Sequence, residues 1–291
     1  DNVMSDRNHY YRTNAAEAAR AMMKLAAWPA PTSRCGTGVP IGLIDTKVDT
    51  THPALKGASI RVLALPDREG LSPSRSDHGT AVASLLVGGR SDNLPSLAPR
   101  TRLIAVDAFR RGRFGDERME AWDLLAAMDA VIGAGARVVN MSFAGEPNSL
   151  LEDALQRVHR RGVVTVAAVG NRGPQSPPLY PAAYDGVIGV TAVGNGRRIY
   201  HRASRGDHVD LAAPGVDIPT ASGNGNRSLR SGTSFAAPFV TAAAAVAQHQ
   251  RRRPLADLKK LFASHAEDLG QPGRDPVYGH GLIQMSRLCR G

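Results

Sequence analysis

The sequence predicts an α/β fold, with a mostly parallel central sheet and helices on both of its faces. Short apolar runs rich in Val, Ile, Leu and Ala recur along the chain and alternate with longer stretches of helical spacing. Continuous apolar runs are typical of strands buried on both faces, and their alternation with helices favours parallel pairing. The chain has 291 residues, of which 42% are hydrophobic, so it can form one sizeable core. No apolar run reaches the roughly 18 residues that a membrane-spanning helix needs.

The expected elements follow this rhythm along the chain. A helix is predicted at 14–27, where Asn14 is a good N-cap and Glu17 its capping-box partner. A connector rich in Pro, Gly, Ser and Thr follows it, so we expect an N-terminal extension at 1–38 and one large domain at 39–291. Strands are expected at 41–45, 60–65, 102–109, 137–142, 163–170, 187–193 and 209–212. Further helices are expected at 78–86, 119–133, 149–161, 234–250 and 255–264.

The net charge of +10 comes from 36 Lys and Arg against 26 Asp and Glu. The basic residues fall in scattered short runs without interleaved aromatic residues, which argues against nucleic-acid binding and favours solvated faces. The cysteines, Cys35 and Cys289, have no second Cys or His at the spacing of a metal site, so we expect no zinc centre. A disulfide between them and two separate buried thiols both remain open.

Four residues at predicted strand ends and helix starts have side chains suited to catalysis. Asp45 ends the strand at 41–45, and His78 lies in the first turn of a helix, where a cation is disfavoured. Asn171 follows another buried strand, and Ser234 opens an Ala-rich helix. Each has an ordinary alternative, since Asp and Asn form turns and Ser caps helices. Because the carboxyl ends of parallel strands share one edge of a sheet, the four are expected to meet there.

Together these residues predict a hydrolase. Ser234 would be the nucleophile and His78 its general base, with Asp45 orienting the imidazole. Asn171 and the backbone N–H of Ser234 would stabilise the oxyanion.

The motifs that surround these residues resemble those of subtilisin-like serine proteases, the subtilase family S8. The resemblance covers most of the chain and rests on Leu43-Ile44-Asp45-Thr46, His78-Gly79-Thr80 and Gly232-Thr233-Ser234-Phe235-Ala236-Ala237-Pro238, in the order Asp, His, Ser. It implies a three-layer subtilisin-like fold, with 39–291 as the catalytic domain. It also implies a serine endopeptidase that acts through an acyl-enzyme, with no cofactor and no metal in the chemistry. It also implies that the protein is secreted or periplasmic.

The resemblance further implies that a protein or peptide substrate binds as an extended strand between two segments. One segment is Ser142, Phe143, Ala144 and Gly145, which would line the pocket for the residue before the cleaved bond; the other lies around Gly112 and Arg113. Arg172 would stand at the pocket rim and favour acidic or neutral residues, while Leu179 would make the pocket shallow.

Two departures from the family pattern affect the expected site. Lys47 stands where the family usually has glycine, so it is either strained or brings a charge close to Asp45. Ala81, directly after His78-Gly79-Thr80, stands where the family usually has a second histidine. Calcium is a weak expectation: the loop at 88–95 offers Asp92 and Asn93, but Arg90 and Pro95 fit such a site poorly.

Two other readings of the sequence remain. A catalytically silent subtilase fold could serve as a binding or regulatory module if Lys47 disturbs Asp45. The same catalytic set could also belong to an esterase or amidase. An inhibitory prodomain or another partner is expected to control the enzyme, and residues 1–38 are too short to form that prodomain.

Overall fold

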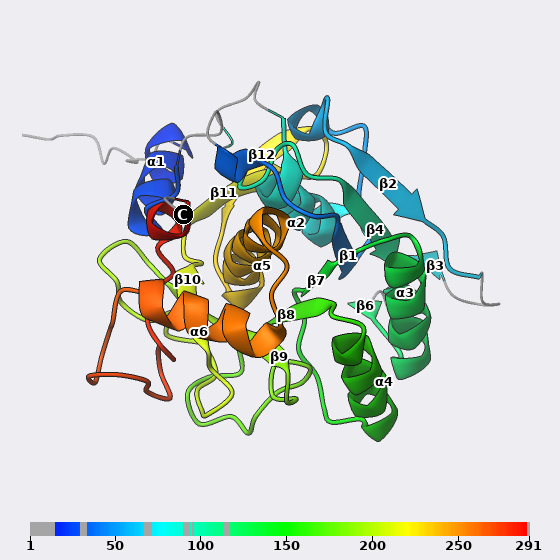
Figure 1. The fold of residues 1–291 in the computed structure, drawn as a ribbon. Helices are drawn as coiled ribbons and strands as arrows, with labels where there is room; N and C mark the ends of the chain where they lie inside the picture. Colours follow the sequence, from blue (N-terminus) through cyan, green and yellow to red (C-terminus); the bar gives the residue numbers. More distant parts are fainter. Residues whose placement is uncertain are drawn as a thin grey trace, which may run out of the picture.

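A seven-stranded sheet with the order β10-β9-β8-β7-β1-β4-β2 forms the centre of the computed structural model (Figure 1). The structure describes residues 15–29, 34–66, 72–89, 94, 96–112 and 117–289. Every neighbouring pair in this sheet is parallel. Its strands are β1 (Ile41–Asp45), β2 (Ile60–Leu63), β4 (Leu103–Asp107), β7 (Val138–Met141), β8 (Val164–Ala168), β9 (Val187–Val193) and β10 (Leu211–Pro214). The expected parallel α/β fold is therefore confirmed.

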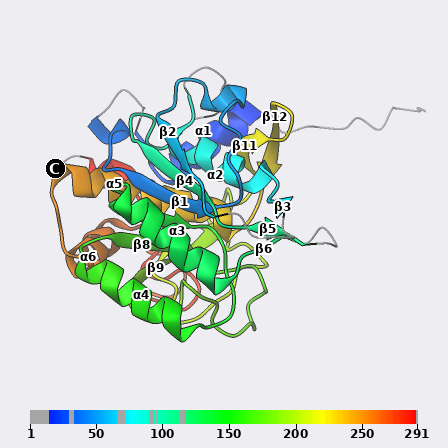
Figure 2. The ribbon, with the colours of Figure 1, turned by 90° about the vertical axis from the view of Figure 1, so that its right-hand side faces the viewer.

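Helices cover both faces of this sheet and make three layers (Figures 1 and 2). The helices α2 (Asp77–Val87) and α5 (Thr233–Gln250) share one hydrophobic cluster with alternate residues of β1, Ile41 and Leu43. The helices α3 (Ala121–Gly133) and α4 (Ser149–Arg160) share a second cluster with Ile44 on the opposite face. The two clusters follow from the period of two in a strand, which sends neighbouring side chains to opposite faces.

The central helix α5 is buried along almost its whole length. Its Ala-rich sequence lets it lie close against β7, β8, β9 and β10. It contains Pro238, which has no N–H to donate to the carbonyl four residues earlier, that of Ser234. The start of this helix therefore needs a hydrogen-bond donor from elsewhere.

Shorter elements complete the structure beyond those expected from the sequence. An antiparallel pair joins β11 (Ile218–Ser222) to β12 (Asn226–Arg230), which leads into α5. A second small sheet contains β3 (Ser72–Pro73), β5 (Arg110–Arg111) and β6 (Glu117–Arg118). The short helix α7 (Met285–Leu288) and the 3₁₀ turns η1 (Arg34–Gly36) and η2 (Pro53–Leu55) are further elements of this kind, whereas the helix α6 (Leu255–His265) matches the one expected at 255–264. No helix in the described ranges has the length and apolarity required to cross a bilayer.

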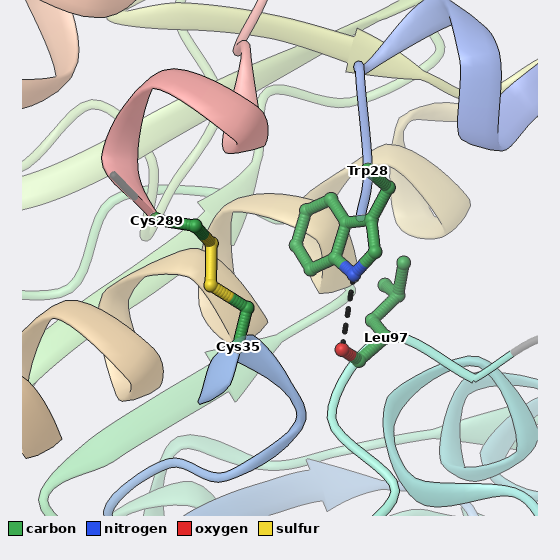
Figure 3. Close-up of a disulfide and its surroundings, with 4 residues drawn as sticks. All are labelled: Trp28, Cys35, Leu97 and Cys289. Carbon is green, nitrogen blue, oxygen red and sulfur yellow. Dashed lines mark hydrogen bonds between the residues drawn. A yellow bond between two sulfur atoms is a disulfide. The ribbon is translucent and has the colours of Figure 1, made fainter. Parts of the chain in front are cut away.

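The helix α1 (Ala15–Leu25) matches the N-terminal helix expected from the sequence, although its expected cap, Asn14, lies outside the described residues. After α1, the indole Nε1 of Trp28 donates to the carbonyl of Leu97 at 3.0 Å (Figure 3). The Trp28 ring also packs edge-on against Phe239.

A disulfide joins Cys35 and Cys289, whose Cα atoms lie 6.0 Å apart (Figure 3). The structure thus decides between the two alternatives for the cysteines in favour of the disulfide. Because 254 residues separate the two cysteines, this bond ties segments near the two ends of the chain to one body.

Candidate active site

The candidate site begins at Asp45, the last residue of β1 and almost completely buried at 1% exposure. Its Oδ1 accepts hydrogen bonds from the backbone N–H of Thr46 and from Nδ1 of His78, both at 2.7 Å. The strand β1 is a central strand between β4 and β7, and Asp45 is its last residue. The carboxylate therefore lies at the edge formed by the carboxyl ends of the parallel strands, near the middle of the sheet. This edge is where open α/β sheets hold their ligands.

His78 is held against this strand end by close contact between backbones. The N–H of Gly79 donates to Oγ1 of Thr46 at 2.8 Å, and a Cβ on Gly79 would clash with the Thr46 carbonyl. Glycine is therefore required at this position so that α2 can start directly over the end of β1. On its other side the imidazole packs against Phe235, with ring centroids 5.5 Å apart.

The imidazole is oriented and polarised by its carboxylate partner. The His78 side chain is 32% exposed, whereas Asp45 is buried. Burial lowers the pKa of His78, but the charge of Asp45 and its hydrogen bond to Nδ1 outweigh this, and the pKa ends above its usual value near 6.5. With Nδ1 donating to the carboxylate, Nε2 is the ring nitrogen that can accept a proton.

Ser234 is the second residue of α5 and lies two residues after Gly232, whose φ of 152° favours glycine. Its carbonyl, which lacks the usual helical donor because residue 238 is proline, accepts a hydrogen bond from Oγ of Ser142 at 2.8 Å. Asn140 donates to the same Ser142 oxygen at 2.9 Å. A buried polar chain therefore fixes the position of the serine backbone. In the described part of the chain the Ser234 hydroxyl has no hydrogen bond to His78, and such bonds are often long in ligand-free enzymes.

Asn171 lies beside the start of the same helix. Its Oδ1 accepts from the backbone N–H of Thr233 at 3.1 Å and from the Thr233 hydroxyl at 3.2 Å. The Thr233 hydroxyl also accepts from the N–H of Gly170 at 3.2 Å. These bonds occupy the carbonyl side of the amide, so Nδ2, which lies beside Gly232, is the atom left to donate to a ligand. The structure thus brings Asp45 and His78 together, and Asn171 and Ser234 together.

The residues of the expected substrate segment, 142–145, differ in what they contact. Ser142 is buried, and its hydroxyl donates to the Ser234 carbonyl at the start of α5. Gly145 exchanges both backbone hydrogen bonds with Tyr180, at 2.7 and 2.9 Å, so its backbone groups are already paired. Phe143 and Ala144 line a hollow of about 400 Å³, in which Phe109 packs edge-on against Phe143 at 5.9 Å.

The remaining expected contacts differ in their environment. Leu179 is buried, and its Cδ1 lies so close to Gly170 that a Cβ there would clash with it. Arg172 is exposed and forms an ion pair with Glu146 at 2.5 Å, which partly balances its charge at the rim. Gly112 follows β5, and Arg113 lies outside the described residues.

Lys47 is not strained. It has no positive φ, its side chain is exposed, and its N–H donates to Oγ of Ser74 at 2.8 Å. Ser74 in turn donates to Oδ1 of Asp107 at 2.7 Å, a contact that sequence reasoning missed because no local pattern signals it. The possibility that Lys47 strains the backbone beside Asp45 is therefore wrong.

No group of His, Cys, Asp and Glu suited to a metal ion occurs among the residues that the structure describes. The loop considered for calcium falls mostly outside them, including Asp92 and Asn93. Calcium binding at that loop stays a prediction.

Comparison with known proteins agrees with this geometry. The model of the subtilase family matches residues 36–281. The chain is 33% identical to a thermophilic serine proteinase of Bacillus sp. (strain AK1) over 84% of its own length and 60% of that protein's. It is 35% identical to the minor extracellular protease Epr of Bacillus subtilis (strain 168) over 71% of its own length, but spans only 32% of Epr.

A solved structure, that of the prenylagaramide maturation protease PagA, superposes with a TM-score of 0.75 at 27% identity, covering 92% of this chain and 97% of that one. The order of strands, the Asp45–His78 pair and the family match agree, and the chain belongs to the subtilase family.

Proposed function

We propose that this protein is a serine endopeptidase that cleaves peptide bonds through an acyl-enzyme. The observation that carries the proposal is the 2.7 Å hydrogen bond from His78 to buried Asp45, beside the helix that begins with Ser234. The subtilase relatives support the reaction class, and the Ser234 roles are inferred from the site.

In the first half of the reaction, Nε2 of His78 takes the proton of the Ser234 hydroxyl as Oγ attacks the substrate carbonyl carbon. The carbonyl π electrons move to oxygen, and the oxyanion accepts from Nδ2 of Asn171 and the N–H of Ser234. The imidazolium, stabilised by Asp45, then protonates the leaving amine as the C–N bond breaks. Water repeats these steps on the ester and releases the acid. The side chains carry every proton, so the proposed chemistry uses no cofactor.

We further propose that the substrate lies as an extended strand along Ser142–Ala144 and the segment at Gly112 and Arg113. Phe143 and the hollow beside it favour an apolar side chain. Arg172, with part of its charge balanced by Glu146, favours acidic or neutral residues before the cleaved bond, and buried Leu179 limits the depth of that pocket. A separate prodomain or partner would hold the enzyme inactive.

The proposed location is outside the cytoplasm. The Cys35–Cys289 disulfide needs an oxidising compartment, and one relative is named as an extracellular protease. This supports a secreted or periplasmic protein.

Labelling with an organophosphonate and digestion of casein test the proposal. Wild type should be labelled and cleave casein, and Ser234→Ala should lose both. The matched control is Ser231→Ala, three residues earlier and exposed, whose hydroxyl accepts from the N–H of Asp217 and donates to Oδ1 of the same residue. A folded wild type that is not labelled would favour the silent binding module, and cleavage of esters but not peptides would favour an esterase.

A further inference from the structure

A charged pair stands next to the proposed base but outside the catalytic set. Asp77 precedes His78 in the first turn of α2, and its side chain is 53% exposed. Its Oδ1 accepts from the N–H of Gly223, in the turn between β11 and β12, at 2.7 Å. Its Oδ2 lies 3.6 Å from Nη2 of Arg230. One carboxylate thus contacts both the turn and the end of this hairpin.

Arg230 is the last residue of β12 and lies four residues before Ser234. Its side chain is only 25% exposed, and its Nε is buried without a hydrogen-bond partner in the described part of the chain. A buried donor left unpaired costs about 1–3 kcal/mol, so packing stability alone is a poor reason for an arginine here. The guanidinium is held at this position by Asp77.

The charges that face His78 come from several elements. Asp45 on β1 and Glu117 on β6 raise the pKa of the imidazole, whereas Arg230 on β12 lowers it, as burial does. Asp77 lies beside His78 on the same helix and balances Arg230. Arg230 therefore acts on the pKa of His78 in the direction opposite to Asp45. The size of its effect depends on how far Asp77 balances its charge.

We propose that Asp77 is a positioning residue that holds Arg230 at the start of α2, one residue from His78, and balances part of its charge, so that the pair sets how readily the His78 imidazole takes and releases a proton. The inference rests on the proposed function, in which His78 must be neutral to accept the Ser234 proton. It must then release that proton to the leaving amine, a step that a nearby cation favours.

The direct test is NMR titration of the His78 ring in the Ser234→Ala background, which needs no catalytic activity. Arg230→Gln removes the cation and should raise the pKa of His78 by about half a unit, while Arg230→Lys should leave it close to the parent value. Asp77→Asn keeps an acceptor for Gly223 but leaves Arg230 unbalanced, and should lower the pKa by about half a unit.

The matched control is Arg227→Gln on the same strand. Arg227 is exposed, and three residues along a strand place its side chain on the face opposite to Arg230, so His78 should titrate as in the parent. Equal titration in Arg230→Gln and Arg227→Gln overturns the proposal, even where Asp77→Asn fails to fold. With Ser234 restored, the acid limb of kcat/KM should move with the titration. If the pKa of His78 shifts as expected but the protein has no peptidase activity, the proposed function is refuted while the proposed role of Asp77 and Arg230 is supported.

Discussion

Replacing Ser142 by alanine should destabilise the protein through the start of helix α5. Residue 238 is proline, so the Ser234 carbonyl has no helical donor, and Oγ of Ser142 fills this place at 2.8 Å. The same oxygen accepts from Asn140, which in turn accepts from Thr241 at 2.8 Å. Alanine would leave one carbonyl and one amide N–H without their partners.

The size of the effect follows from these two groups. A buried polar group left unpaired costs about 1–3 kcal/mol, so the loss of both partners should lower the free energy of unfolding by about 2–6 kcal/mol. At about 2 °C per kcal/mol for a domain of this size, the melting temperature should fall by about 4–12 °C. Circular dichroism of the Ser234→Ala protein measures this without self-digestion. Ser264→Ala is the matched control, because this hydroxyl is exposed and contacts only the carbonyl of Leu261 and Nδ1 of His265 on its own helix, and it should change the melting temperature by about 1 °C or less.

A double-mutant cycle with Pro238→Ala tests the mechanism itself. Alanine at 238 supplies the missing N–H to the Ser234 carbonyl, so Ser142→Ala should cost about 1 kcal/mol less in that background than in the parent. Equal costs in the two backgrounds would show that Ser142 does not replace the proline's missing donor, and the reasoning would be refuted.

Other regions of the molecule give further predictions. Replacing Cys35 and Cys289 by serine opens a loop with a sequence separation of 254, and should cost about 5 kcal/mol and lower the melting temperature by about 10 °C; an unchanged melting temperature contradicts this. Glu146→Gln frees Arg172 and should raise kcat/KM about 2–5-fold for peptides with an acidic residue before the cleaved bond. A library profile dominated by Lys or Arg there refutes the assignment. Burial, then the charge of Lys259, lowers the pKa of His159 to about 4.

The lowered pKa of His159 determines how the stability of the protein changes with pH. Protonation is harder in the folded state, so stability should fall as the pH drops below 6.5, by at most about 3 kcal/mol, and level off below about 4. Urea unfolding across this range should show a smaller loss in His159→Gln, and identical pH profiles for the two proteins would contradict the assignment.

The main sheet was predictable because its strands are short apolar runs, and all of them except β2 are buried along most of their length. The bounds of β1 and β9 agree with the expectation, whereas β10 runs on to Pro214, where the expected strand stopped at 212. Proline is tolerated there because β10 is an edge strand, which the sequence cannot show. The hairpin β11–β12 was missed, although Asn224 and Gly225 at its turn, both with positive φ, carry the usual hairpin signal.

The candidate site was predictable only where function depends on position along an element. Asp45 ends a strand, Asn171 follows one, and His78 and Ser234 lie at helix starts, so the contacts of Asp45 with His78 and of Asn171 with the start of α5 follow from these positions. Their charge environment depends instead on contacts across the fold, which local sequence does not encode.

Two positively charged residues near the site show this limit. Lys47 lies only two residues after Asp45 in the sequence, yet its side chain is exposed to solvent and its backbone is unstrained. Arg230 is far from His78 in the sequence, yet Asp77 holds it where its charge reaches the imidazole. Proximity along the chain draws attention to the charge of Lys47 and overlooks that of Arg230. The electrostatic effect of a charge depends on the exposure of its side chain and on its partners from other elements. The basicity of the proposed catalytic histidine is therefore a property of the assembled layers, not of the motif that contains it.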